Sequence, residues 1–147
     1  MGIILVMSEK KKVIIQIVSH QGSEQTRGQF DGVMQVKGNT YYVQYTEEQS
    51  MPHQGQVRTL LKISDHSLKI IRHGSVESEQ SFIAEQRCPG FYRSPYTSFN
   101  LSTQTDKLEI QHHGNELKVT WVYDLYVYEE LNGNFINSLH IQEEVKS

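Results

Sequence analysis

The sequence has too few cysteines and apolar runs to form a disulfide scaffold or a membrane span. Its single cysteine, Cys88, has no partner within the chain, so we expect the reducing environment of the cytoplasm. The apolar run from Ile3 to Met7 is far shorter than the roughly 20 residues that cross a bilayer, and its lysines follow it, whereas a secretory signal carries its positive charge first. We therefore expect no membrane segment and no secretion signal, and we expect residues 1–8 to form a loose N-terminal arm.

The sequence also lacks helical periodicity, because no window repeats apolar residues at helical spacing for three turns. Apolar and polar residues alternate in short segments instead, and the longest stripe occupies every second position from Leu117 to Val127. Such alternation is typical of strands with one buried face. Residue pairs that favour positive φ separate the segments, as expected for hairpin turns. These pairs are Gly38-Asn39, Asp65-His66, His73-Gly74, Gly114-Asn115 and Asn132-Gly133.

These patterns predict one all-β domain over residues 1–147, with little helix. We expect about eight strands in an antiparallel up-and-down barrel; a two-sheet sandwich is the alternative, because both folds bury one face of each strand. A polar stretch, residues 21–27, follows the first strand-like run, and the polar segment 47–56, which contains Pro52 and Gly55, is predicted to be a longer loop.

The charge balance argues against a polyanionic partner. Seventeen acidic residues against fourteen basic ones give a formal net charge of -3. The only tight basic cluster, Lys10-Lys11-Lys12, precedes a strand-like run and is predicted to be a solvated strand entry. We expect no nucleic-acid partner and no membrane partner.

Motifs for catalysis or metal binding are absent as well. Seven histidines are scattered along the chain, and the adjacent pair His112 and His113 would point to opposite faces of a strand, so both cannot bind one ion inside the barrel. There is no Gly-x-Ser-x-Gly nucleophile motif and no glycine-rich phosphate loop. The paired glutamates fall at predicted strand ends. We expect no metal, no cofactor and no enzymatic activity.

Several local signatures, in order, resemble a small family of uncharacterised bacterial proteins, the YwiB-like calycin-type β-barrels. The segments that carry the resemblance are 41–47 (YYVQYTE), 57–63 (VRTLLKI), 71–76 (IRHGSV), 80–82 (QSF), 99–105 (FNLSTQT) and 122–127 (VYDLYV). The resemblance implies a lipocalin-like eight-stranded barrel and supplies no function. The Gly-x-Trp signature of true lipocalins near the first strand is missing, because Trp121 lies late in the chain.

A charged feature inside the barrel is the remaining candidate site. Arg72 shares parity with Leu68 and Ile70, and Asp124 shares parity with Val122 and Tyr126, so each could face a lumen. A charge inside a barrel needs a partner or water. One hypothesis is an internal ion pair between Arg72 and Asp124. The other is that Arg72 holds the carboxylate or phosphate of a ligand whose tail lies against Tyr42, Phe82, Phe99 and Trp121.

These residues leave two functions open. The first is a non-enzymatic barrel that binds a small, partly apolar molecule in its cup. The alternative is a solid barrel that acts as a protein-protein interaction module or a homodimer, with its function on an edge strand, a loop or a dimer face. The sequence does not decide between them, since eight strands enclose a space that side chains can just fill.

Overall fold

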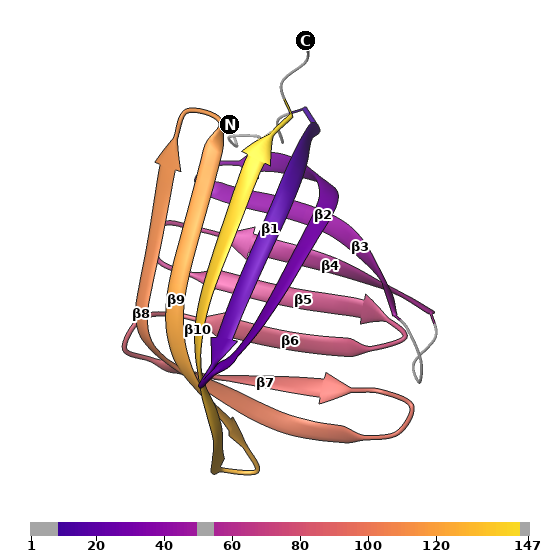
Figure 1. Cartoon of the computed structure of the whole chain (residues 1–147), viewed down its shortest axis with the longest axis vertical. Coiled ribbons are helices and arrows are strands. Elements are labelled where there is room, and N and C mark those ends of the chain that lie inside the picture. The colour runs from indigo at the N-terminus through magenta and orange to yellow at the C-terminus, as the bar shows by residue number, and fades with distance from the viewer. Residues whose placement is uncertain (1–8, 50–54, 145–147) are drawn as a thin grey trace, which may run out of the picture.

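The computed structural model describes residues 9–49 and 55–144, and within these ranges it contains ten strands and no helix. Each strand pairs antiparallel with its neighbours in sequence, and β1 also pairs with β10, so the sheet closes on itself. In Figure 1, β8, β9, β10 and β1 run upright in front, and β3 to β6 cross behind them. The strands are β1 (Lys11–Gln21), β2 (Glu24–Lys37), β3 (Thr40–Gln49), β4 (Gly55–Ile63), β5 (Leu68–Gly74), β6 (Glu77–Phe82), β7 (Arg87–Arg93), β8 (Ser98–His113), β9 (Glu116–Val127) and β10 (Glu130–Glu143).

The predicted all-β, antiparallel up-and-down barrel is therefore confirmed, with ten strands in place of about eight. Closure of the sheet decides for a barrel over a sandwich. The polar stretch of residues 21–27 belongs mostly to strands, because β1 and β2 continue to a two-residue turn at Gly22-Ser23, where Gln21 pairs with Glu24. These strand ends are polar because they are exposed to solvent.

The predicted loop over residues 47–56 is shorter than expected at both ends. Strand β3 extends to Gln49, and β4 begins at Gly55. Residues 50–54 of this segment, like the predicted N-terminal arm at residues 1–8, lie outside the described residues.

The turn between β9 and β10 lies at Tyr128-Glu129, four residues before the predicted Asn132-Gly133 turn. Both turn residues have positive φ, 52° and 64°, although neither is glycine. A positive φ at a bulky residue costs about 1–3 kcal/mol and persists where surrounding contacts hold it. Asn132 and Gly133 instead fall at a register shift within β10.

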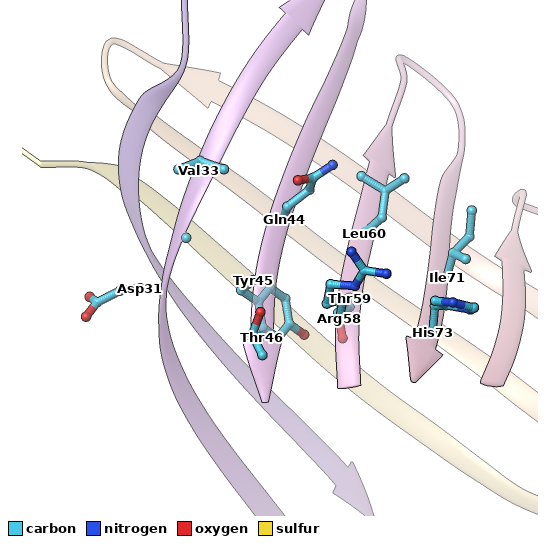
Figure 2. A pocket seen from close by; sticks show the side chains of 11 residues that line it. Asp31, Val33, Gln44, Tyr45, Thr46, Arg58, Thr59, Leu60, Ile71 and His73 are labelled. Carbon is cyan, nitrogen blue, oxygen red and sulfur yellow. The ribbon is translucent and has the colours of Figure 1, made fainter. Parts of the chain in front are cut away.

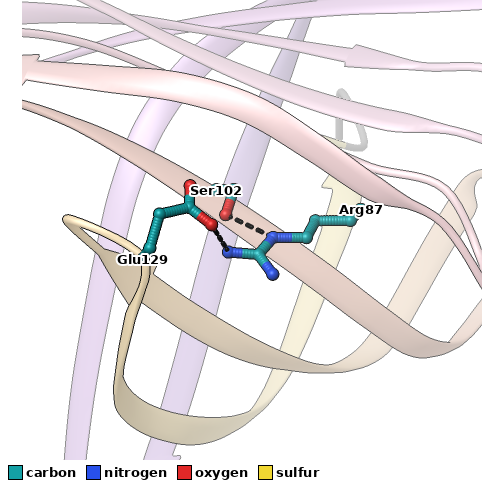
Figure 3. A network of polar contacts seen from close by, with 3 residues as sticks. All are labelled: Arg87, Ser102 and Glu129. Atoms are coloured by element: carbon teal, nitrogen blue, oxygen red, sulfur yellow. Dashed lines mark hydrogen bonds and ion pairs between the residues drawn. The ribbon is translucent and has the colours of Figure 1, made fainter.

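Arg87 on β7 provides contacts that hold this turn (Figure 3). Its Nη2 forms an ion pair with Oε2 of Glu129 at 3.0 Å, and its Nε donates a hydrogen bond to Oγ of Ser102 at 2.8 Å. The guanidinium also lies 4.0 Å from the ring centroid of Tyr126. Arg87 thereby links the β9–β10 turn to β7 and β8.

Inward-facing side chains fill the barrel unevenly along its length. At what we call the packed end, the interior consists of aliphatic residues that are almost completely buried. They are Val13, Ile15, Val43, Leu61, Ile63, Leu68, Leu117, Val119, Leu139 and Ile141. At the other end, which we call the open end, aromatic and polar side chains face inward instead. Full burial of one aliphatic side chain contributes roughly 1.5–3 kcal/mol, so the packed end supplies much of the hydrophobic core.

Candidate functional site

The open end encloses a cavity of about 380 Å³ inside the barrel. This volume is near the lower end of the roughly 300–1,000 Å³ that small-molecule sites occupy. Aromatic rings form much of its wall, namely those of Phe30, Phe82, Trp121, Tyr123 and Phe135. Polar side chains from six strands complete the lining and include Ser19, Thr26, Glu47, Arg72, Gln80 and Asn137.

Arg72 is the charged group that the cavity shares with the predicted site. Strand β5 alternates strictly, so Arg72 faces inward with Leu68 and Ile70, as its parity predicts. Its Nε is buried and has no hydrogen-bond acceptor within the described residues. No carboxylate of residues 9–49 and 55–144 forms an ion pair with it. An inward-facing guanidinium without a carboxylate partner is a ready site for an anion.

Trp121 supplies a second donor of the same kind. Its side chain is almost fully buried against Phe82, with the ring centroids 5.7 Å apart. The indole Nε1 is buried and also lacks an acceptor among the residues that the structure describes. A buried donor without an acceptor costs about 1–3 kcal/mol, so these two donors, whose side chains line one cavity, need an explanation.

Two tyrosines flank Arg72 and stay protonated over the physiological range. Burial raises the pKa of Tyr45 above its ordinary value, although the nearby Arg72 charge lowers it in part. Burial raises the pKa of Tyr123 to about 12, against the opposing effects of a hydrogen bond with Asn137 and the Arg72 charge. Asn137 is held in turn by Oγ of Ser19, which donates to its Oδ1 at 2.6 Å. The cavity therefore offers neutral phenols beside one guanidinium.

The structure brings three of the six predicted site residues together and separates the others. Arg72, Phe82 and Trp121 line the cavity. Tyr42 lies on the outer face of β3, with the Lys62 ammonium 5.8 Å from its ring centroid. Its neighbours Val43 and Tyr45 face inward, so the alternation of the strand turns Tyr42 away.

Asp124 also lies on the outer face, so the hypothesis of an internal pair with Arg72 is wrong. Trp121 and Tyr123 are the inward residues of β9, and Asp124 has the opposite parity. Its Oδ1 accepts a hydrogen bond from Nδ2 of Asn134 on β10 at 2.9 Å. The bulky residues at 122, 126 and 128, whose parity Asp124 shares, are outward or exposed and do not line the lumen.

Phe99 lies away from the cavity in the β7–β8 hairpin, which projects beyond β6 in Figure 1. Its ring stacks on Tyr92 with centroids 5.2 Å apart and is tilted toward Tyr128 at 6.3 Å. Phe99 therefore packs in a small aromatic cluster between this hairpin and the β9–β10 turn.

Several cavity residues were not predicted from the sequence. Tyr123 could have been found, because it follows Trp121 in the same alternating stripe. Glu47 could not, because residues 47–56 were assigned to a loop, and Phe30 could not, because only closure of the sheet brings it to the same cavity as Phe82. The ring of Phe30 stacks on Tyr45 at 4.6 Å.

A larger hollow of about 520 Å³ lies on the outer face of β2 to β5 (Figure 2). Its floor is a register row of Val33, Gln44, Leu60 and Ile71, one residue from each strand. Arg58 and His73 flank this row and are exposed. Water can satisfy these polar groups, so this groove carries a weaker argument for a ligand than the cavity does.

The described part of the chain offers neither a metal cluster nor a membrane-spanning helix. Within residues 9–49 and 55–144, no three or more His, Cys, Asp or Glu side chains gather in a way that could hold a metal ion. The same residues include no helix with the length and apolar character needed to cross a membrane.

Comparison with known proteins agrees with the fold. The chain is 26% identical over 99 residues to the uncharacterized beta-barrel protein YwiB of Bacillus subtilis (strain 168), a match that covers 67% of this chain and 68% of that protein. The crystal structure of the ywiB protein from Bacillus subtilis superposes with a TM-score of 0.76 at 20% identity, over 95% of this chain and 96% of the other. The model of a family described as "Domain of unknown function (DUF1934)" matches residues 12–141. The chain therefore belongs to the DUF1934 family, whose function is unknown.

Proposed function

We propose that this protein is a binding protein whose barrel holds a small, partly apolar anion in the cavity at its open end. The observation that supports the proposal is the pair of buried donors, Arg72 Nε and Trp121 Nε1, which lack acceptors among the described residues and belong to side chains of one cavity. A carboxylate accepts several hydrogen bonds at once and also neutralises the guanidinium.

The surrounding rings suit the apolar part of such a ligand. Phe82 and Tyr123 pack in a tilted arrangement at 4.7 Å, and Tyr123 stacks on Phe135 at 5.2 Å, so the wall is rigid and aromatic. The cavity volume favours a ligand about the size of one ring with a short acidic arm over a long acyl chain. This use of the lumen would be lipocalin-like, and a cavity supports a ligand role over the alternative of a solid interaction module. The lone, buried Cys88 supports a cytoplasmic location.

Binding of 3-phenylpropionate, with 3-phenylpropionamide as the uncharged control, tests the proposal. Trp121 is the only tryptophan and lines the cavity, so tryptophan fluorescence reports on this side chain. We expect the acid to bind and the amide to bind at least about tenfold more weakly, since hydrogen bonds to charged groups contribute roughly 1.5–3 kcal/mol.

Arg72→Met should reduce the affinity for the acid by a similar factor. It should leave the free energy of unfolding unchanged within about 1 kcal/mol, or raise it, because it removes a buried donor without an acceptor. Arg58→Met, in the outer groove, is the matched control and should keep full affinity. Equal affinity of the acid for Arg72→Met and for the unmodified protein would overturn the proposal.

A further inference from the structure

The cavity holds a second charged side chain, Glu47, in addition to Arg72. Glu47 is an inward residue of β3, two positions beyond Tyr45, and it is half-buried. Arg72 lies on β5, and β4 separates β5 from β3. Tyr45, Thr59 and Arg72 form one register row across these three strands. Glu47 lies opposite Val57 in the next inward row, closer to the end of the barrel. The third charged residue of the lining, Arg27, is exposed at the rim.

Glu47 and Arg72 have opposite charges and face the same cavity, yet they form no ion pair with each other among the described contacts. Both act on the Tyr45 phenol, where Arg72 lowers the pKa and Glu47 raises it. Both charges are therefore near one point in the cavity wall, on opposite sides of the strand between them.

Two unpaired opposite charges in one cavity are complementary to a molecule that itself carries both signs. An anionic group alone would satisfy Arg72 and leave Glu47 repelling it across the cavity, because like charges in a confined site destabilise each other. A cationic group on the same ligand, a few bonds from the anion, would remove that repulsion and add a charge-assisted hydrogen bond.

We infer that the ligand is a zwitterion of the amino-acid class with an aromatic or similarly compact apolar side chain, whose carboxylate binds Arg72 and whose ammonium group binds Glu47. This inference rests on the proposed function and names its ligand class. The rings around Phe82 and Tyr123 receive the side chain, and the Trp121 indole offers a further donor to the carboxylate.

The test compares three probes that differ by one group: phenylalanine carries both charges, 3-phenylpropionate lacks the amine, and phenethylamine lacks the carboxylate. Trp121 fluorescence titrations would give three affinities for each variant. In the unmodified protein, phenylalanine should bind roughly three- to tenfold tighter than 3-phenylpropionate, and phenethylamine should bind weakest.

Glu47→Gln should abolish the advantage of phenylalanine and leave 3-phenylpropionate at the same affinity or tighter. Glu48→Gln, the adjacent and exposed glutamate, is the matched control and should change none of the three. The inference is overturned if 3-phenylpropionate binds through Arg72 and phenylalanine binds no tighter. It is also overturned if Glu47→Gln weakens the binding of both probes by the same factor. In either case the proposed function survives. If neither probe binds, both proposals fall together.

Discussion

The two ends of the barrel interior use the same strands for different purposes. At the packed end, aliphatic side chains fill the space, and residues such as Leu61 and Ile63 have no exposed surface. At the open end, the same sheet presents Arg72, Tyr123 and Asn137, and a cavity remains between them. Because the packed end supplies much of the stability of the fold, the open end can hold polar groups that lower stability.

The strongest test of this comparison is a large-to-small substitution at the packed end. Leu61→Ala should lower the free energy of unfolding by about 2–5 kcal/mol, because it removes buried methyl groups and leaves a cavity. Urea denaturation would measure the change. Leu60→Ala is the matched control on the outer face of the same strand, where the side chain is partly exposed, and should cost less than half as much. Equal losses at both positions would contradict the assignment of the two faces.

A second test addresses the open end at alkaline pH. The pKa of Tyr123 is about 12 in the folded protein against an ordinary value of 10.0, so the folded state holds the phenol proton more tightly than the unfolded state. Its contribution, on the order of 3 kcal/mol, is fully present below pH 10 and is lost as the pH rises from 10 to 12.

Tyr123→Phe should therefore show a smaller fall in the free energy of unfolding between about pH 9 and the highest pH at which the protein stays folded. Urea denaturation at a series of pH values would measure it, and absorbance of the phenolate would follow the titration. Tyr45 and Lys11, whose pKa values are also raised, are present in both proteins and cancel in the comparison. Parallel pH profiles would show that burial of Tyr123 does not govern its ionisation.

The smallest expected effect concerns the hydrogen bond that orients Asn137. Ser19→Ala removes the donor to Asn137 Oδ1, which leaves a buried acceptor without its partner and should cost about 1 kcal/mol. Ser23→Ala, in the exposed turn between β1 and β2, should change the free energy of unfolding by less than about 0.5 kcal/mol. No difference between the two variants in denaturant titrations would mean that water replaces the Ser19 hydroxyl.

Features of the site that depend on neighbouring residues in the sequence were predictable, whereas features that depend on contacts between distant strands were not. The inward parity of Arg72, Phe82 and Trp121 follows from local alternation, and the structure places all three on one cavity. Asp124 was assigned inward because bulky neighbours share its parity, but on β9, as on β3 where Tyr42 lies, aromatic residues occupy both faces. Bulk alone therefore does not identify the inner face of a tyrosine-rich strand.

The turns likewise differ in whether local sequence or contacts distant in sequence determine their position. Gly38-Asn39 and Gly114-Asn115 connect strands as predicted, with φ of +59° at each glycine, because the conformational preference is local. Asn132-Gly133 has the same composition but lies within β10. The turn at Tyr128-Glu129 depends on contacts with β7 and β8, among them those of Arg87, which are distant in sequence.

By itself the sequence determined the class of the fold, since period-two alternation and glycine-containing turns act over a few residues and leave an antiparallel meander as the outcome. Only the tertiary structure decided that ten strands close through β1 and β10 and that one end is filled while the other keeps a cavity. It also decided that Glu47 and Arg72 share that cavity without pairing. Closure and cavity size depend on which residues meet across the barrel, and that information lies in the register between strands that are far apart in the chain.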